Sequence, residues 1–267
     1  MLTESSSGQA IEANGAVLHY EERGDGAPLI LIHGGLASGA MWEPVVPELA
    51  DSFRVITPDS RGHGRSTNPS ETLSYSLIAD DIAALIDALG LDRPVVGGWS
   101  DGGQVTLELG ARHPGAAAGL VVGAAYPDFE STGLREAHRE LLGADQRGVP
   151  DQRHLDAELG ESAEEIKALH PGGAEHWEAL VRQTASMWLD YKGLGSCELQ
   201  ALREPVLVLA GDHDELIPIE LAILLYRRLP DAELAVCPRL SHDGPSPERS
   251  AALAGLIRDF AHRHTQD

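Results

Sequence analysis

Residues 94–103 read PVVGGWSDGG, an apolar run that leads into glycines on either side of one serine. The run is typical of a buried strand, and the residues that follow, GQVTLELGARH, are typical of a helix. Gly98, Ser100 and Gly102 form a GxSxG pattern where the strand becomes the helix. A tight turn there exposes the hydroxyl, and its glycines are needed because larger side chains would collide. The stretch therefore predicts a nucleophilic serine, Ser100, at a nucleophile elbow.

Strands and helices alternate on both sides of this elbow. Upstream, residues 27–35 (APLILIHGG) and 54–58 (RVITP) are typical of buried strands that end at turns. Residues 74–90 have apolar side chains at helical spacing and end at Gly90, so we expect a helix there. Residues 118–126 (AGLVVGAAY) predict another strand. The alternation predicts the α/β class, a mostly parallel sheet flanked by helices. Asn14-Gly15 predicts an opening hairpin, and a helix is expected at about 39–51.

The alternation stops near residue 127 and resumes at 204–214 (EPVLVLAGDHD). A helix, the short strand 233–238 (ELAVCP) and a final helix are expected after it, with Pro247 in the first turn of that helix. The interruption, residues 128–203, is rich in helix formers and carries no convincing strand. We expect it to form a helical cap, inserted after strand 6 into an α/β core of residues 1–127 and 204–267.

Composition excludes several classes of function. Asp and Glu number 42 against 20 Lys and Arg, a formal net charge of −22, which disfavours binding to nucleic acid or to an anionic membrane surface. No apolar run is long enough to span a membrane, and residues 1–15 lack the features of a signal peptide, so we expect a cytoplasmic protein. Cys197 and Cys237 form neither a disulfide scaffold nor a zinc motif. No dinucleotide or P-loop motif is present, so we expect no cofactor and no metal.

A serine hydroxyl needs a base to become a nucleophile, and an elbow of this kind predicts an acid and then a histidine later in the chain. Asp212 and Asp214 both follow the strand near 206–211, and either could be the acid. His242 is the histidine that lies between the last strand and the last helix. We therefore expect Ser100, His242 and one of the two aspartates to form a catalytic triad. His33 and His63 precede the serine and are expected to be structural.

The oxyanion formed during acyl transfer needs backbone N–H donors that are fixed in advance. We expect one from Asp101, the residue after the nucleophile, and the other from Gly35, in the loop after residues 29–33.

Together the stretches LILIHGG, PDSRGHGRS, VVGGWSDGG, LVLAGDHDELIP and LSHDG resemble the α/β-hydrolase superfamily over residues 9–263. The family pattern G-x-x-D-x-x-x-P, at Gly211 to Pro218, implies that Asp214 is the acid and Asp212 a turn residue. Residues 59–66 resemble a structural turn of the family. The chain is most similar to the small cofactor-free members, namely carboxylesterases, enol-lactonases, hydrolases of the valacyclovir-hydrolase type and non-haem haloperoxidases. Haloalkane dehalogenases have an aspartate where this chain has Ser100.

The sequence thus predicts a serine hydrolase that cleaves a small-molecule carboxylic ester or lactone through an acyl-enzyme. Two alternatives stay open: carbon–carbon bond hydrolysis of a diketone, and a ligand sensor with slow turnover on the same fold. Trp99, Met187 and Trp188 are candidates either for apolar substrate contacts or for plain core. The Asp101 side chain either places a charge at the start of the helix or, as the resemblance implies, binds a substrate ammonium group.

Overall fold

The computed structural model describes residues 8–127 and 133–265, and within them eight strands form one sheet in the order β1-β2-β4-β3-β5-β6-β7-β8. The strands β3 to β8 run parallel, and β2 pairs antiparallel with both β1 and β4. This mostly parallel sheet confirms the predicted fold class. The strands are β1 (Gln9–Ala13), β2 (Ala16–Arg23), β3 (Ala27–Ile32), β4 (Phe53–Pro58), β5 (Val95–Trp99), β6 (Gly119–Gly123), β7 (Val206–His213) and β8 (Ala232–Ser241).

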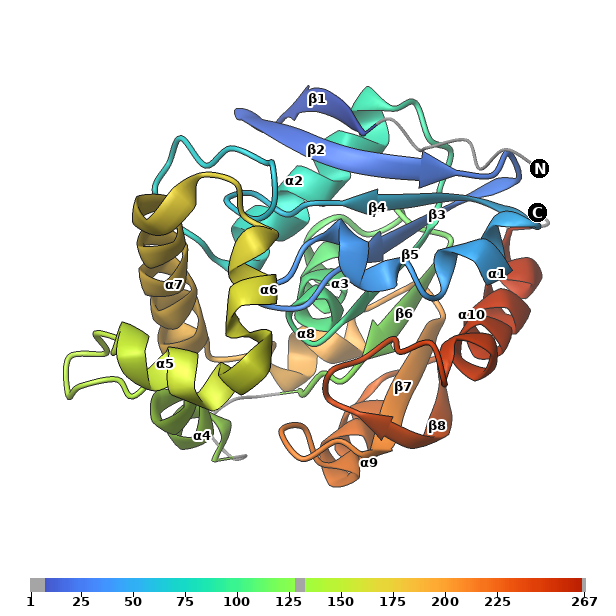
Figure 1. Cartoon of the computed structure of the whole chain (residues 1–267). Helices are drawn as coiled ribbons and strands as arrows, with labels where there is room; N and C mark the ends of the chain where they lie inside the picture. Colours follow the sequence, from blue (N-terminus) through green and yellow to red (C-terminus); the bar gives the residue numbers. More distant parts are fainter. Residues whose placement is uncertain (1–7, 128–132, 266–267) are drawn as a thin grey trace.

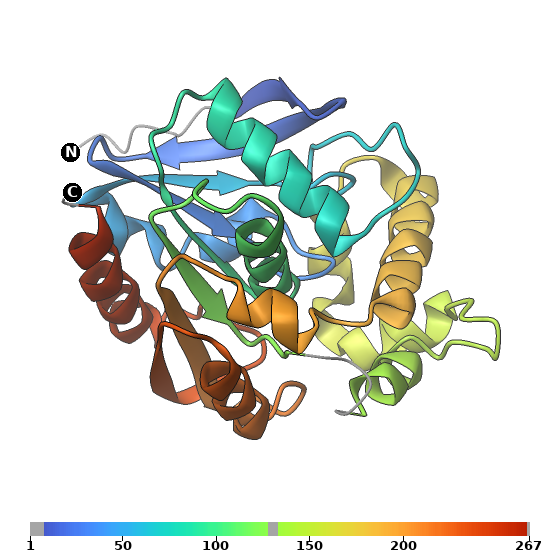
Figure 2. The ribbon, with the colours of Figure 1, turned by 180° about the vertical axis from the view of Figure 1, so that it is seen from behind.

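Helices cover both faces of the sheet (Figures 1 and 2). Because successive side chains of a strand point to opposite faces, Ile30 and Ile32 of β3 pack toward one set of helices and Leu29 and Leu31 toward the other. The first set comprises α2 (Tyr75–Ala88), α3 (Asp101–Arg112) and α9 (Ile219–Arg228), and the second comprises α1 (Val46–Ala50) and α10 (Ser250–His264). All four side chains are fully buried, so β3 lies in the centre of a core with two layers.

The opening hairpin and the helix α2 confirm the local predictions. Asn14 and Gly15 both have positive φ angles, 46° and 73°, as a two-residue turn between twisted strands requires. The side chain of Ser74 accepts a hydrogen bond from the N–H of Leu77 and so caps the start of α2. Gly90 has a φ of 61°, just beyond the end of that helix.

Three boundaries differ from the predictions. The helix expected at 39–51 is split into a 3₁₀ helix, Gly39–Trp42, and α1, which has Pro47 in its first turn. Proline has no N–H and is tolerated in the first turn of a helix but not in its interior, so α1 begins anew at Val46. Strand β8 runs to Ser241 and includes Pro238, which is tolerated because β8 lies at the edge of the sheet. Pro247 precedes α10, which begins at Ser250, instead of lying in its first turn.

The described part of residues 128–203 is helical. Figure 1 shows α4 (Leu134–Leu141), α5 (Gln152–Leu159), α6 (Ala163–Ala168) and α7 (Gly173–Asp190) gathered at one end of the sheet. We propose that these four, which we call the cap helices, form the predicted cap. The short helix α8 (Ser196–Gln200) contacts α9 instead, so the last part of the predicted range packs with the core.

A histidine joins the cap helices to the core. His170, between α6 and α7, accepts a hydrogen bond from the N–H of Gly64 through Nδ1 (2.9 Å) and donates from Nε2 to the carbonyl of Leu36 (3.0 Å). One nitrogen must be bare and the other protonated for both bonds to form, so the ring is neutral. Burial lowers the pKa of His170, which favours this neutral form.

Two further buried histidines continue from this joint into the core. The ring centroid of His63 lies 6.0 Å from that of His170 and 5.0 Å from that of His33. His33 accepts from the N–H of Ser60 (2.9 Å), and Nδ1 of His63 faces the carbonyl of Arg61 (3.1 Å). Burial lowers the pKa of both rings, that of His63 to well below its usual range. The three histidines therefore require neutral rings in the folded protein.

This requirement predicts a dependence of stability on pH. A histidine whose pKa is lowered by folding binds fewer protons in the folded chain, so its contribution to stability is complete above about pH 6.5 and is lost as the pH falls below it. The wild type should have a lower unfolding free energy at about pH 5.5 than at about pH 7.5. In His63→Leu this decrease should be smaller by up to about 1.4 kcal/mol. Urea unfolding at the two pH values measures this difference. His213→Gln, at an exposed position, is the control; equal losses in wild type and His63→Leu would contradict the prediction.

Candidate active site

Ser100 sits at a strained turn between β5 and α3. Its φ of 56° and ψ of −118° are unusual for a residue with a side chain. A Cβ atom on Gly98 would lie 2.2 Å from the backbone of Gly102, and one on Gly102 would lie 2.1 Å from the carbonyl oxygen of Ile32. Both glycines are therefore required for α3 to begin so close to the strands, and the turn is the predicted elbow.

The structure brings the three predicted side chains together. The hydroxyl oxygen of Ser100 lies 3.0 Å from Nε2 of His242, and Nδ1 of His242 lies 3.0 Å from both carboxylate oxygens of Asp214. A carboxylate only accepts hydrogen bonds, so the proton of the neutral imidazole is on Nδ1 and its Nε2 is free to accept from the serine. The arrangement can remove a proton from Ser100 as the hydroxyl attacks a carbonyl carbon.

Backbone contacts hold the acid and the base in place. Asp214 is 8% exposed, and its Oδ1 also accepts hydrogen bonds from the N–H groups of Leu216 (3.1 Å) and Ile217 (2.7 Å). The indole N–H of Trp99 donates to the carbonyl of His242 (2.9 Å), which fixes the loop after β8 relative to the residue before the nucleophile. The position of the imidazole is thus set from both sides.

Asp212, the other candidate acid, lies apart from His242. It is exposed, and its carboxylate accepts a hydrogen bond from the N–H of Arg239, a residue with a φ of 61°. This contact joins the ends of the neighbouring parallel strands β7 and β8, where their pairing register shifts. Asp212 is therefore a residue of strand β7 that bonds its neighbouring strand, and not the turn residue that the resemblance implied.

A cavity of about 400 Å³ opens beside Ser100 and His242. Its walls are mostly apolar, with Trp99 and Trp188 among them, and come from the core and from the cap helices. The described lining residues are Gly34, Gly35, Leu36, Ala37, Met41, Trp99, Ser100, His138, Leu141, Leu155, Leu159, Ser162, Ile166, Trp188, Leu216, His242 and Asp243. We call this cavity the Ser100 pocket.

Met187 does not join Trp188 in these walls. It is 4% exposed and packs in the hydrophobic core. Adjacent residues of a helix point about 100° apart, so only one of the two faces the Ser100 pocket. Of the two roles considered for Met187, the structure agrees with plain core.

The two predicted oxyanion donors lie where the loop after β3 passes the elbow. A Cβ atom on Gly34 would lie 3.4 Å from the Cβ of Ser100, and one on Gly35 would lie 2.5 Å from the Trp188 ring and 2.6 Å from a carboxylate oxygen of Asp101. Position 35 therefore has no room for a side chain. The N–H of Asp101 belongs to the first turn of α3, which leaves it without an acceptor in its own helix. These two backbone N–H groups can donate hydrogen bonds to an oxyanion that forms beside Ser100.

The side chain of Asp101 makes contacts that neither sequence interpretation anticipated. It is 8% exposed and accepts hydrogen bonds from the Tyr75 hydroxyl (2.7 Å) and from the indole N–H of Trp188 (2.8 and 2.9 Å to its two oxygens). Burial raises the pKa of Asp101, and the two hydrogen bonds act against that shift. Its carboxylate already has protein donors, so it is more than a charge at the start of a helix.

Sequence reasoning missed two residues at this site. Tyr75 begins α2 and carried no signal beyond that of an ordinary core aromatic. His138, on α4, lines the Ser100 pocket, donates from Nδ1 to the carbonyl of Leu134 (2.7 Å) and places its ring centroid 4.9 Å from that of Trp188. Burial lowers the pKa of His138, so its ring is neutral. It belongs to no motif, and only the packing of α4 on α7 brings it to the site.

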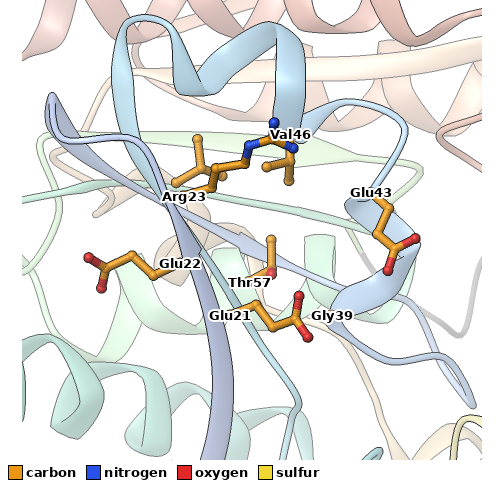
Figure 3. Close-up of a pocket in the computed structure, with 8 residues that line it drawn as sticks. Glu21, Glu22, Arg23, Gly39, Glu43, Val46 and Thr57 are labelled. Atoms are coloured by element: carbon orange, nitrogen blue, oxygen red, sulfur yellow. The ribbon is translucent and has the colours of Figure 1, made fainter. Parts of the chain in front are cut away.

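A second cavity, of about 270 Å³, lies between β2, β4 and the segment 39–46 (Figure 3). Figure 3 shows Glu22 turned away from Glu43, and Glu22 pairs with Arg54 at 2.8 Å. Three glutamates, Arg23, Thr57 and apolar side chains line this cavity, with no serine, cysteine or histidine among its described lining residues. It therefore lacks the hydrogen-bonded serine and histidine that the Ser100 pocket holds.

The described residues lack two other kinds of site. In those ranges no group of three or more His, Cys, Asp or Glu side chains is placed to hold a metal ion. None of the described helices combines the length and the apolar character that crossing a membrane requires.

Comparison with known proteins agrees with the fold. A family model described as alpha/beta hydrolase fold matches residues 27–160. The chain is 31% identical to 2-hydroxymuconate semialdehyde hydrolase of Pseudomonas sp. strain CF600, over 95% of this chain and 93% of that protein. It is 31% identical to pimeloyl-[acyl-carrier protein] methyl ester esterase of Aeromonas hydrophila, over 83% and 91% of the two chains. Among solved structures, a thermophilic esterase from Thermogutta terrifontis matches with a TM-score of 0.78 and 26% identity, covering 98% of this chain and 100% of that chain.

The family match covers the strand β3, the elbow and part of the cap helices, and the relatives extend over nearly the whole chain. They include esterases as well as a semialdehyde hydrolase, so they agree on the fold and on hydrolysis rather than on one bond. The chain belongs to the alpha/beta hydrolase family.

Proposed function

We propose that this hydrolase cleaves a small neutral carboxylic ester or lactone through an acyl-enzyme. The observation that carries the proposal is the hydrogen-bonded chain from the Ser100 hydroxyl through His242 to Asp214, with 3.0 Å at each step. This order of groups, which follow the parallel strands β5, β7 and β8, supports a serine nucleophile with a histidine base.

The proposed reaction has two halves. The Ser100 oxygen attacks the substrate carbonyl while Nε2 of His242 takes the hydroxyl proton, and Asp214 stabilises the imidazolium that forms. The N–H groups of Gly35 and Asp101 donate to the oxyanion of the tetrahedral intermediate. His242 then returns the proton to the leaving alkoxide, which departs as the alcohol. In the second half His242 deprotonates water as the water attacks the acyl carbonyl. The bond to the Ser100 oxygen then breaks, His242 returns the proton to that oxygen, and the acid is released. No step needs a cofactor.

The charge of the Ser100 pocket favours a neutral substrate. None of its described lining residues is Lys or Arg, Asp243 is among them, and the Asp101 carboxylate is buried nearby. A substrate carboxylate would lose its hydration here and find no cationic partner. The Pseudomonas relative is named for a muconate semialdehyde, which carries a carboxylate, whereas the Aeromonas relative is named as a methyl ester esterase. The pocket therefore supports ester or lactone cleavage over carbon–carbon cleavage of an anionic diketone.

The first prediction concerns the nucleophile. Ser100→Ala should lower kcat for p-nitrophenyl acetate by about 10⁶-fold, because no other group can form the acyl-enzyme. It should also abolish covalent labelling by a fluorophosphonate. Circular dichroism checks that the variant is folded, and Ser186→Ala, at an exposed serine of α7, is the matched control. Labelling that persists in folded Ser100→Ala would place the nucleophile elsewhere.

The second prediction separates the two aspartates. Asp214→Asn should lower kcat by about 10³- to 10⁴-fold, because the amide no longer holds the reactive tautomer of His242 or stabilises its charged form. Asp212→Asn changes only a contact between β7 and β8, so kcat should stay within about a factor of three, while the melting temperature falls by a few degrees. Steady-state kinetics and thermal unfolding of both variants make the comparison. A larger loss of kcat in Asp212→Asn would overturn the assignment of the acid.

The third prediction concerns substrate charge. Methyl hexanoate and monomethyl adipate have similar length, but the second ends in a carboxylate. We expect kcat/KM to be at least about 10-fold higher for the neutral ester, because the pocket offers that carboxylate no cation. The same assay includes a neutral lactone and a dienoate diketone. Faster turnover of the anionic ester, or cleavage of the diketone alone, would refute the proposed substrate class.

A further inference from the structure

The carboxylate of Asp101 connects the nucleophile elbow to a cap helix. Asp101 is the first residue of α3, and Trp188 lies near the end of α7, so the hydrogen bonds between them join two separate parts of the fold. Both side chains are buried, at 8% and 6% exposure. The contact is therefore shielded from water. A hydrogen bond to a charged acceptor is strongest in such a shielded place.

Two protein donors hold the carboxylate in this arrangement. An indole N–H can only donate, and it lies 2.9 Å from Oδ1 and 2.8 Å from Oδ2 of Asp101. The Tyr75 hydroxyl donates to Oδ1 at 2.7 Å, from a residue that is itself 1% exposed. Tyr75 holds the carboxylate from the core side, and the carboxylate in turn holds Trp188 from the cap side.

Trp188 forms the wall of the Ser100 pocket that lies against Gly35, in the loop after β3. Its Cζ2 atom would be only 2.5 Å from a Cβ on Gly35, so the indole packs directly on that glycine. On another side its ring centroid lies 4.9 Å from that of His138, which also lines the pocket. The position of this one indole therefore decides how much space remains beside Gly35 for the substrate.

We propose that Asp101 is a positioning residue which, by holding Trp188 against Gly35, limits the size of the acyl group that the Ser100 pocket accepts. The inference rests on the proposed function, since it concerns the specificity of that same site. It assigns the side chain of Asp101 a role separate from that of its backbone N–H. A compact acyl group fits the pocket while the hydrogen bonds are intact, and a longer one requires Trp188 to move.

The test is a double-mutant cycle between Asp101→Asn and Trp188→Phe. The asparagine keeps the size of the side chain but can place an amide donor opposite the indole N–H, and the phenylalanine removes the indole donor. The readout is the ratio of kcat/KM for p-nitrophenyl octanoate to that for p-nitrophenyl acetate. Each single variant should raise this ratio by about 10-fold, because the wall is released and the longer chain enters. In the Trp188→Phe background, Asp101→Asn should change the ratio little further, since the residue acts through Trp188.

Each variant has a matched control on its own helix. Trp177→Phe makes the same change on α7, where the indole N–H of Trp177 has no acceptor among the described residues. Glu108→Gln removes a buried carboxylate of α3 that accepts from the hydroxyl of Tyr191 (2.9 Å). Both controls lower stability without touching the Asp101–Trp188 contact. We expect them to leave the octanoate-to-acetate ratio at the wild-type value.

Three results would overturn the inference. One is a ratio that moves as much in the controls as in Asp101→Asn, which would mean general loosening of the fold. Another is multiplicative effects of the two variants in the cycle, which would mean that Asp101 does not act through Trp188. The third concerns an α-amino ester and its des-amino analogue. If the wild type prefers the amino ester, Asp101→Asn abolishes that preference and Trp188→Phe keeps it, then the carboxylate is a substrate anchor.

Failure of the proposed function would give a different result. A wild type that a fluorophosphonate labels at Ser100, but that hydrolyses no ester or lactone, would refute the function and leave the inference testable. The rate of labelling by a long-chain relative to a short-chain fluorophosphonate then takes the place of the ester ratio in the same cycle. Equal ratios in all variants would refute the role of Asp101.

Discussion

The close approach of α3 to the strands behind it is the constraint on which the site depends. Hydrogen atoms in place of side chains at Gly98 and Gly102 let the helix begin against β3 and β5, and this forces Ser100 into a positive φ. The turn lies at the carboxyl edge of the sheet. Loops that follow other parallel strands reach the same edge, so residues distant in sequence, such as Gly35 and His242, meet there. Because α3 begins so close to β3 and β5, Ser100 lies at this edge, where short loops bring the other reactive side chains to it.

The walls of the pocket depend on a different kind of contact. The cap helices meet the core through buried polar groups at two described places, His170 on the backbone of Gly64 and Leu36, and Trp188 on Asp101. Both contacts lie beside the loop that carries Gly35. Apolar packing alone would tolerate small sliding movements, whereas a hydrogen bond to a buried partner has a strict geometry and is costly to leave unmade. The pocket is therefore shaped by a few directional contacts within mostly apolar walls.

Local pattern and chain order were enough to predict the framework of the site but not the packing of its walls. The sheet class, the elbow at Ser100 and the helix α2 depend on periodicity and on glycine, whose effects act within a few residues. The contact of Asp101 with Trp188 joins residues 87 positions apart. It depends on the orientation of α7 about its own axis, which sets which side chains face the core. That orientation also decides that Trp188 rather than Met187 faces the pocket, and no periodicity within one helix can fix it when apolar residues are adjacent. The break before α1 had a local signal in Pro47, because proline is tolerated in the first turn of a helix but not in its interior.

A fixed carboxylate beside an oxyanion site looks unfavourable until both charges of the transition state are counted. Two unit charges about 6 Å apart interact by about 3 kcal/mol at an effective dielectric constant of about 20. A charged Asp101 side chain would oppose the developing oxyanion. The same step creates an imidazolium on His242, which Asp101 attracts. Because the two charges form together, only the difference between their distances to Asp101 matters. The donors Tyr75 and Trp188 stabilise the negative charge of Asp101. A carboxylate can therefore hold the pocket wall at this position with little net cost to the reaction at Ser100.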